Sequence, residues 1–202
     1  METKKQVAKA KRLLKKVDRE GMSELIIYLK KIGYFTAPAA RAHHGNFRGG
    51  LCYHSVSVYE TFKKLLKLTG SNLSEDTIII VSLLHDLIKT KAYTFNENGR
   101  IGLNPDKPKG HCLPSIKMLE QYITLTPEEI HLIKYHMGIF ESQTIDKKYG
   151  AYPIWAMIKV NNKEPLTMLF HMADNISATF IEKRDKIIKK EIINDKIKTD
   201  TD

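Results

Sequence analysis

Residues 77–89 read TIIIVSLLHDLIK, and the fold is best predicted from this segment outward. Nearly every residue from Ile78 to Leu84 is apolar, so a helix formed here is hydrophobic around its whole circumference. Such a helix is predicted to lie at the centre of the molecule. His85 and Asp86 follow at once, where burying an unpaired carboxylate costs on the order of several kcal/mol. The charge of Asp86 therefore needs a partner, and a divalent cation would provide one.

Helical periodicity on both sides of this stretch predicts a helical bundle. Apolar residues at helical spacing predict further helices over residues 4–19, 24–31, 51–68, 114–122 and 127–137, and from 165 onwards. Ser74 is a predicted N-cap, and Thr126-Pro127-Glu128-Glu129 is typical of a helix start with a capping box. Residues 91–104 lack the helical period and contain Asn98-Gly99, a preferred hairpin turn. The predicted fold is all-α, a compact helical bundle that allows for one small β-hairpin near residues 91–104.

Three segments are expected along the chain. Residues 1–32 are predicted to form N-terminal helices that pack on the domain, and residues 33–182 the domain itself. Residues 183–202 are predicted to be a charged C-terminal tail, helical or frayed, because the polar run that begins at Glu182 offers little to bury.

Composition and charge limit the class of protein. With 202 residues, 42% hydrophobic and 28% charged, the chain is long enough to bury one core and is expected to be soluble. It has no apolar run near the roughly 20 residues that span a bilayer and no secretory signal, so no membrane association and a cytoplasmic location are expected. The net charge is +10, and residues 1–31 hold ten Lys/Arg against four Asp/Glu. This excess either attracts a polyanion or is simply a solvated helix face. The sequence does not indicate an oligomeric state.

Histidine and aspartate recur where apolar helices would not place them. His54 lies in the first turn of a mostly apolar helix, and Asp174 lies within LFHMADNISA. A lone buried histidine is more often a hydrogen-bonded core residue. Together with His85-Asp86, however, these residues bring imidazole and carboxylate groups from three helices. That ligand set suits one or two divalent ions such as Mn, Fe, Co, Ni or Zn.

The order H…HD…D, formed by His54, His85-Asp86 and Asp174, resembles the HD-domain superfamily of metal-dependent phosphohydrolases over roughly residues 40–180. His111 and His136 lie between the pair and the last aspartate, which is similar to the HD subgroup that binds two metal ions. The segment HGNFRGGLCYHSVSVY (44–59) is similar to bacterial 3′→5′ exoribonucleases. The overall layout resembles small stand-alone HD proteins, and the subgroup includes dinucleoside polyphosphate hydrolases.

This resemblance implies an enzyme that hydrolyses a phosphoester or phosphoanhydride of a nucleotide or short single-stranded oligonucleotide. It implies six metal ligands: His54, His85, Asp86, His111, His136 and Asp174. Asp86 would bridge two ions, since one carboxylate has an oxygen for each, with His54, His85 and Asp174 on one ion and His111 and His136 on the other. A metal-activated water would attack phosphorus.

Other residues are expected to assist this chemistry. Lys89 would act beside Asp86 in catalysis and hold a phosphate oxygen, although an exposed lysine at a helix C-terminus is an equally good interpretation of its position. His44 and Arg48, in the glycine-rich loop before His54, are predicted substrate contacts. His171, one turn before Asp174, is predicted to support the metal ligands.

Two other functions stay open. A 3′→5′ exonuclease on single-stranded nucleic acid is favoured by the basic N-terminal residues. It is opposed by the predicted helices over residues 1–31, where the exoribonucleases carry an OB-fold. The second function is a non-catalytic nucleotide-binding or interaction module on an HD scaffold. The complete ligand set disfavours it, because a module that only binds does not need every ligand.

Overall fold

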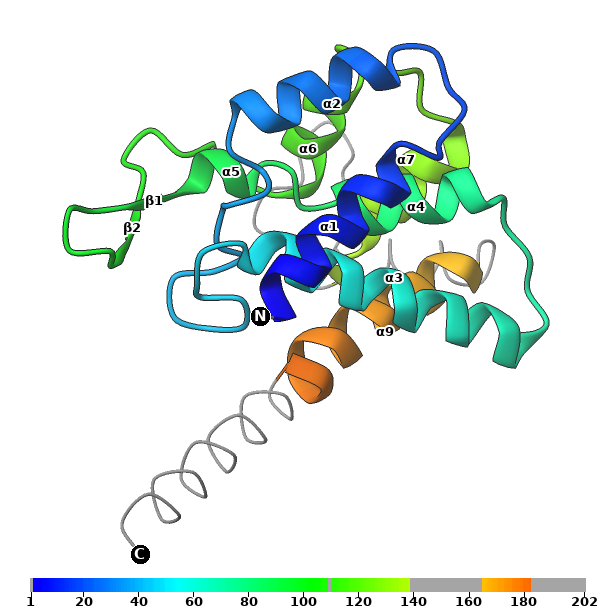
Figure 1. Cartoon of the computed structure of the whole chain (residues 1–202). Helices are drawn as coiled ribbons and strands as arrows, with labels where there is room; N and C mark the ends of the chain where they lie inside the picture. The colour runs from blue at the N-terminus through cyan, green and yellow to red at the C-terminus, as the bar shows by residue number, and fades with distance from the viewer. Residues whose placement is uncertain (1, 109, 139–164, 183–202) are drawn as a thin grey trace, which may run out of the picture.

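The computed structural model describes residues 2–108, 110–138 and 165–182, and in these the chain is a helical bundle with one hairpin (Figure 1). The helices are α1 (Glu2–Leu14), α2 (Met22–Lys31), α3 (Gly50–Thr69), α4 (Glu75–Leu84), α5 (Lys89–Ala92), α6 (Cys112–Leu119), α7 (Pro127–Tyr135), α9 (Pro165–Ile176) and the π-helix η3 (Ser177–Ile181). The strands are β1 (Tyr93–Phe95) and β2 (Ile101–Leu103). The predicted fold class is confirmed. The predicted tail, 183–202, lies outside the described residues, and the division into three segments stays a prediction.

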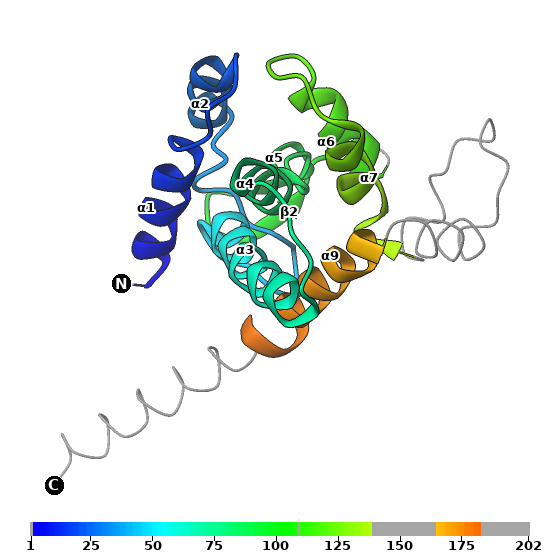
Figure 2. The same ribbon diagram turned by 90° about the vertical axis from the view of Figure 1, so that its right-hand side faces the viewer.

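Helix α4 is the centre of the bundle. Figure 2 shows it between α1 and α2 on one side and α6 and α7 on the other, with α3 beside it. Ile79, Ile80 and Leu83 are fully buried, as a helix that is apolar all round requires. Its start is fixed by Ser74, whose hydroxyl accepts a hydrogen bond from the Thr77 N–H at 3.1 Å.

The HDLIK segment leaves α4 earlier than its sequence predicts. The helix ends at Leu84, and the next turns close through i→i+3 bonds, from the Leu87 N–H to the Leu84 carbonyl and from the Lys89 N–H to the Asp86 carbonyl. The Ile88 N–H instead donates to the hydroxyl of Ser115 on α6, at 3.1 Å. This contact with a distant element replaces the bond that would continue the helix.

The hairpin forms where helical periodicity is lost. β1 and β2 are antiparallel, with Tyr93 opposite Leu103 and Phe95 opposite Ile101. Gly99 has a φ of 71° in the turn, a left-handed conformation that glycine adopts without steric cost. Asn96 closes the turn, because its side-chain oxygen accepts from the Arg100 N–H at 2.8 Å.

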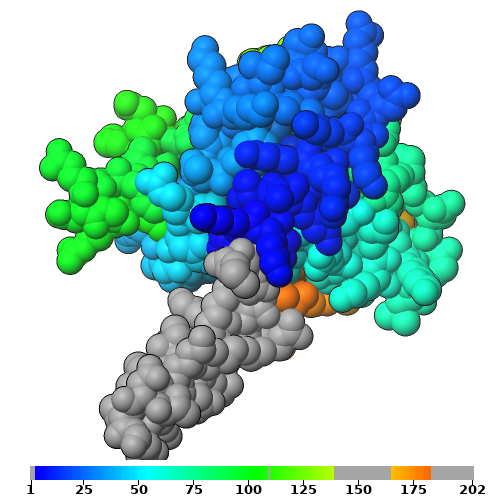
Figure 3. Space-filling model, in the orientation of Figure 1, coloured from blue at the N-terminus to red at the C-terminus, as the bar shows by residue number. Residues whose placement is uncertain are grey.

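The N-terminal helices cover one face of the bundle. In Figure 3, α1 and α2 (blue) lie over that face, and α1 packs on α3 and α4. The connection between them is tied to α7 by Arg19, whose guanidinium donates two hydrogen bonds to the Glu129 carboxylate at 2.6 and 2.9 Å. Among the described residues no helix is both long and apolar enough to cross a membrane.

Candidate metal centre

Five of the predicted ligand residues meet in the middle of the bundle. His54 comes from the second turn of α3, His85 and Asp86 follow the end of α4, His136 follows α7, and Asp174 lies on α9. The three imidazoles are fully buried and the Asp86 side chain is 2% exposed. Asp174 is slightly more open, at 15%. Residues far apart in the sequence thus form one polar cluster inside an apolar core.

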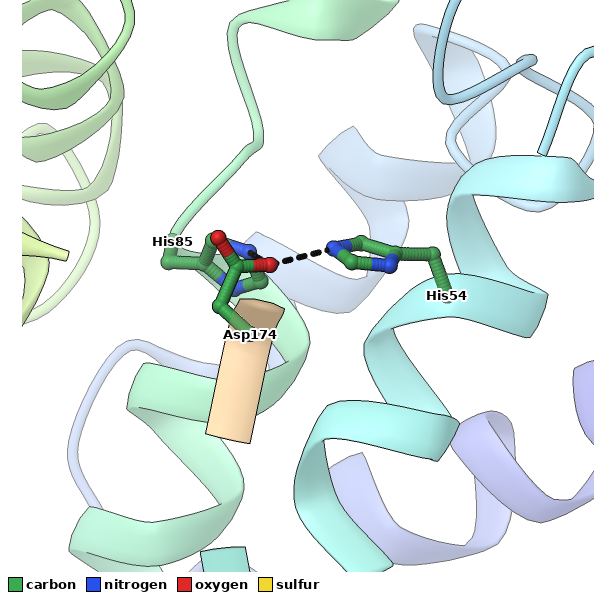
Figure 4. Close-up of side chains that lie close together, drawn as sticks. All are labelled: His54, His85 and Asp174. Carbon is green, nitrogen blue, oxygen red and sulfur yellow. Dashed lines mark ion pairs between the residues drawn. The ribbon is translucent and has the colours of Figure 1, made fainter. Parts of the chain in front are cut away.

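The distances divide this cluster into two overlapping groups of three potential ligand atoms, each within 4.8 Å of one another. In the first, Asp174 Oδ1 lies 2.9 Å from His54 Nε2 and 3.9 Å from His85 Nε2, and a dashed line in Figure 4 joins this carboxylate to the ring of His54. In the second, Asp86 Oδ2 lies 3.4 Å from His85 Nε2, and Asp86 Oδ1 lies 3.7 Å from His136 Nε2. His85 belongs to both groups.

The outer nitrogens of the three histidines are all anchored. His85 Nδ1 donates to the Ser82 carbonyl at 3.0 Å, and His136 Nδ1 donates to the Ile133 carbonyl at 2.6 Å. His54 Nδ1 lies 2.7 Å from a carboxylate oxygen of Glu182. With Nδ1 held in this way, Nε2 of each ring points into the cluster, where it could bind a metal ion once it carries no proton, and proteins usually orient metal-binding histidines like this.

The inner atoms fit a cation. The Nε2 atoms of His85 and His136 and Oδ1 of Asp86 are buried and, within the described part of the chain, make no hydrogen bond. A buried polar atom without a partner costs about 1–3 kcal/mol, so three at one point call for a common partner, and His54 Nε2 and Asp174 Oδ1 lie beside them as an ion pair. Imidazole nitrogen and carboxylate oxygen are ligands of Mn, Fe, Co, Ni and Zn, and His54, His85, Asp86, His136 and Asp174 would hold such an ion.

The electrostatics keep the carboxylates ionised. Burial opposes the charge of Asp86, but the Lys89 ammonium and the neighbouring histidines outweigh it and hold the pKa of Asp86 well below its usual range. Burial likewise opposes the charge of Asp174, yet hydrogen bonding and attraction to His54 lower its pKa. Burial lowers the pKa of His54, while Glu182 and Asp174 raise it, to about 10 overall. A metal ion at His54 Nε2 would therefore take the place of a proton.

Lys89 is part of the cluster. Its side chain is 9% exposed, and Nζ lies 2.5 Å from Asp86 Oδ2. The interpretation of Lys89 as an exposed lysine at a helix end is therefore wrong. Burial alone would lower the pKa of Lys89, but the Asp86 carboxylate raises it, so the ammonium stays charged.

A cavity of about 790 Å³ opens beside the cluster. Its lining includes Lys89, His136 and Asp174 from the cluster and several aromatic side chains, namely Phe47, Tyr53 and Tyr93. The cavity is therefore a space beside the cluster in which a small molecule could reach these three residues.

The loop before α3 brings His44 to this cavity. The Ala39 N–H donates to the Gly45 carbonyl, and Gly50 packs so close that a Cβ there would lie 1.9 Å from the same oxygen. Only glycine allows this approach. The ring of His44 lies against that of His54, with centroids 4.7 Å apart, and its Nε2 is buried.

Three other predicted residues take different places. His111 lines the cavity but is outside both groups of ligand atoms, so its role as a ligand stays a prediction. Arg48 is exposed, lies over the Phe95 ring at 5.0 Å and is not among the residues that line the cavity. His171 lines the cavity, and its Nδ1 donates to the His136 carbonyl at 2.5 Å, so it holds the segment that carries His136.

Glu182 was missed by the sequence reasoning. It is the last residue predicted for the domain and opens the polar run from which the tail is predicted, yet it is 8% exposed and contacts His54. The charged run around it gives no local signal for burial. The eight-residue spacing from Asp174 would place it about 80° away around a regular α-helix.

The comparison with known families agrees with this site. The HD domain family model matches residues 51–179, a range that contains all five clustered residues. The chain belongs to the HD-domain superfamily of metal-dependent phosphohydrolases. No curated protein and no solved structure matches the chain. His44 and Glu182 lie outside the matched range.

Proposed function

We propose that this chain hydrolyses a phosphoester or phosphoanhydride bond of a nucleotide or short oligonucleotide. The observation that supports this most is the orientation of three buried histidines, whose Nδ1 atoms are anchored and whose Nε2 atoms converge beside two carboxylates. A bound divalent ion would supply an activated water and neutralise charge on phosphoryl oxygens. The family to which the chain belongs supports the same class of reaction.

Lys89 would bind and orient the phosphate. Its ammonium lies at the junction of the cluster and the cavity, charged because of Asp86. A phosphate oxygen that reached the cluster through the cavity would meet this cation. In the low-dielectric interior such a contact is stronger than on the surface.

The walls of the cavity suit a nucleoside. Aromatic rings such as Phe47, Tyr53 and Tyr93 offer faces on which a base would stack, a contact worth about 1–3 kcal/mol in single-strand binding. Burial, with the neighbouring His54, lowers the pKa of His44 to about 3, so His44 would contact substrate as a neutral hydrogen-bonding group. The volume of about 790 Å³ lies within the roughly 300–1,000 Å³ of small-molecule sites.

A substrate screen with matched variants tests the proposal. Chelator-treated protein would be reloaded with Mn, Fe, Co, Ni, Zn or Mg and assayed on nucleotides, dinucleoside polyphosphates and short single-stranded oligonucleotides. Lys89→Met should lower turnover more than metal content, because its proposed partner is the phosphate. Lys91→Met, which removes an exposed lysine two residues away, should leave turnover unchanged.

The same screen separates the alternatives. Release of mononucleotides from the 3′ end of oligonucleotides, without cleavage of free nucleotides, would identify a 3′→5′ exonuclease. Full metal occupancy with no turnover of any substrate would overturn the proposal in favour of a nucleotide-binding module.

A further inference from the structure

Glu182 is a buried carboxylate that the HD pattern does not explain. Its Oε1 lies 2.7 Å from His54 Nδ1, across 128 positions of sequence, and the residue is 8% exposed. Its second oxygen, Oε2, is also buried and makes no hydrogen bond within the described residues. Because a buried carboxylate is costly unless it is paired, the contact with His54 is what offsets this burial.

The π-helix η3 brings Glu182 to this position. Each residue of an α-helix advances by about 100°, so Glu182, eight positions after Asp174, would lie about 80° away around the helix. The i→i+5 turn of η3 takes in roughly one extra residue and cancels most of that rotation. Glu182 thereby returns to the side of the helix that carries Asp174.

The position of η3 is fixed by its neighbour. The Ser177 hydroxyl donates to Thr61 Oγ1 on α3 at 3.2 Å, and both side chains are buried. In Figure 1, η3 (orange) lies close to α3, the helix that carries His54. The two carboxylates therefore reach opposite nitrogens of one ring, and Figure 4 shows the His54 nitrogen that faces Asp174.

His54 differs from the other two histidines in its outer partner. His85 and His136 each donate from Nδ1 to the backbone carbonyl three residues earlier. His54 lies inside α3, and its ring has a carboxylate instead. A charged acceptor makes the opposite nitrogen a stronger ligand than a carbonyl does, in addition to fixing the ring.

We propose that Glu182 is a positioning residue that orients His54 and strengthens it as a metal ligand, with the π-turn of η3 as the structural device that delivers it. This inference rests on the metal centre of the proposed function, but not on the substrate. It places a residue that supports the centre three positions beyond the range matched by the family model.

Three variants test the role: Glu182→Ala removes the acceptor, Glu182→Gln keeps an acceptor without charge, and Thr179→Ala changes an exposed neighbour as a control. The first measurement is calorimetric titration of chelator-treated protein with Mn²⁺ and Zn²⁺. Loss of an outer partner typically costs about 10–100-fold in metal affinity, and we expect this for Glu182→Ala. Glu182→Gln should lose less, and Thr179→Ala should bind like the unmodified protein.

The second measurement needs no metal. In chelator-treated protein labelled with ¹⁵N-histidine, the Nδ1–H of His54 should give a strongly deshielded proton signal. This signal should disappear in Glu182→Ala and persist in Glu182→Gln and Thr179→Ala. It also keeps the test decisive if Glu182→Ala is too unstable for titration, because Glu182→Gln must then retain the signal and bind metal more weakly than the unmodified protein.

The outcomes separate this inference from the proposed function. Metal affinity in Glu182→Ala equal to that of the unmodified protein would overturn the positioning role, even if the enzyme is active. Failure of the unmodified protein to bind metal would overturn it as well. Weakened binding in Glu182→Ala together with loss of the ring signal would support it, even if no phosphate substrate were ever turned over.

Discussion

Phe170 packs against two of the candidate metal ligands, His85 and His136, and its replacement should weaken metal binding more than the replacement of a neighbouring phenylalanine. The side chain is fully buried on α9. Its ring meets His85 edge-on, with centroids 5.6 Å apart, and lies 6.3 Å from the His136 ring. It also packs against Phe62, with ring centroids 5.0 Å apart. Phe170→Leu would keep an apolar side chain but remove all three ring contacts.

The expected magnitudes follow from these contacts. Aromatic pairs contribute about 0.5–1.5 kcal/mol each beyond the area they bury, so Phe170→Leu should lower the free energy of unfolding by about 2 kcal/mol. Phe62→Leu is a matched control, because Phe62 is also fully buried and packs on Phe170. It should cost about 1–2 kcal/mol. Only Phe170→Leu frees the two imidazoles, so only it should weaken metal binding, by about tenfold.

Two experiments measure the two effects separately. Urea unfolding in the presence of a chelator gives the stability of each variant without a contribution from bound metal. Titration of the folded proteins with Mn²⁺ gives the affinity. Equal metal affinities for Phe170→Leu and Phe62→Leu would contradict this prediction, since packing against the two histidines would then have no effect on metal binding.

Two further predictions concern the scaffold. Glu129 is buried and accepts hydrogen bonds from Arg19, Thr77 and the Thr126 N–H, so Glu129→Gln should lower the free energy of unfolding by about 3 kcal/mol. Glu75 forms an exposed pair with Lys63, so Glu75→Gln should lower it by at most about 1 kcal/mol. Similar urea midpoints for the two variants would contradict this prediction. Burial raises the pKa of the Cys52 thiol to about 12, so iodoacetamide should leave Cys52 unmodified in the folded protein at about pH 9 and should alkylate it in urea. Peptide mass spectrometry would measure both results. Rapid labelling of the folded protein would contradict the prediction, because the thiol would then be accessible.

Local signals in the sequence predicted the elements that local interactions determine. The predicted capping box at Thr126 and Glu129 is present, and both of its hydrogen bonds join residues that are only three positions apart. Ser74 caps α4, and Asn98-Gly99 lies in the hairpin turn. In each case the preference of a few neighbouring residues is sufficient.

Elements that depend on distant partners differ from their prediction. The helix from residue 77 was expected to continue to Lys89, but Ser115 takes the Ile88 N–H and the helix ends at Leu84. The second helix was expected to begin after Ser23, but its N-cap is Gly21, whose φ of 82° and contact with the Tyr122 carbonyl depend on the packing of α2. Neither partner is visible in the local sequence.

The candidate site shows the same division. The spacing of His54, His85-Asp86 and Asp174 was enough to select residues that the structure brings together. The place of Glu182 depends on a π-turn, which adds one residue to the register and has no recognised sequence signal here. The sequence pattern therefore indicates the residues that cluster here, although it also indicates His111, which lies outside both groups, and it does not indicate Glu182.

The most direct test of the metal centre is a metal titration of chelator-treated protein beside its Asp86→Asn variant. This substitution keeps the size of a buried side chain that belongs to the second group of ligand atoms. The unmodified protein should bind at least one Mn²⁺ or Zn²⁺ per chain, and Asp86→Asn should bind at least about tenfold more weakly, because the charge of a ligand oxygen is lost. A protein that binds neither ion, or one whose affinity Asp86→Asn leaves unchanged, would contradict the assignment of this cluster as a metal centre.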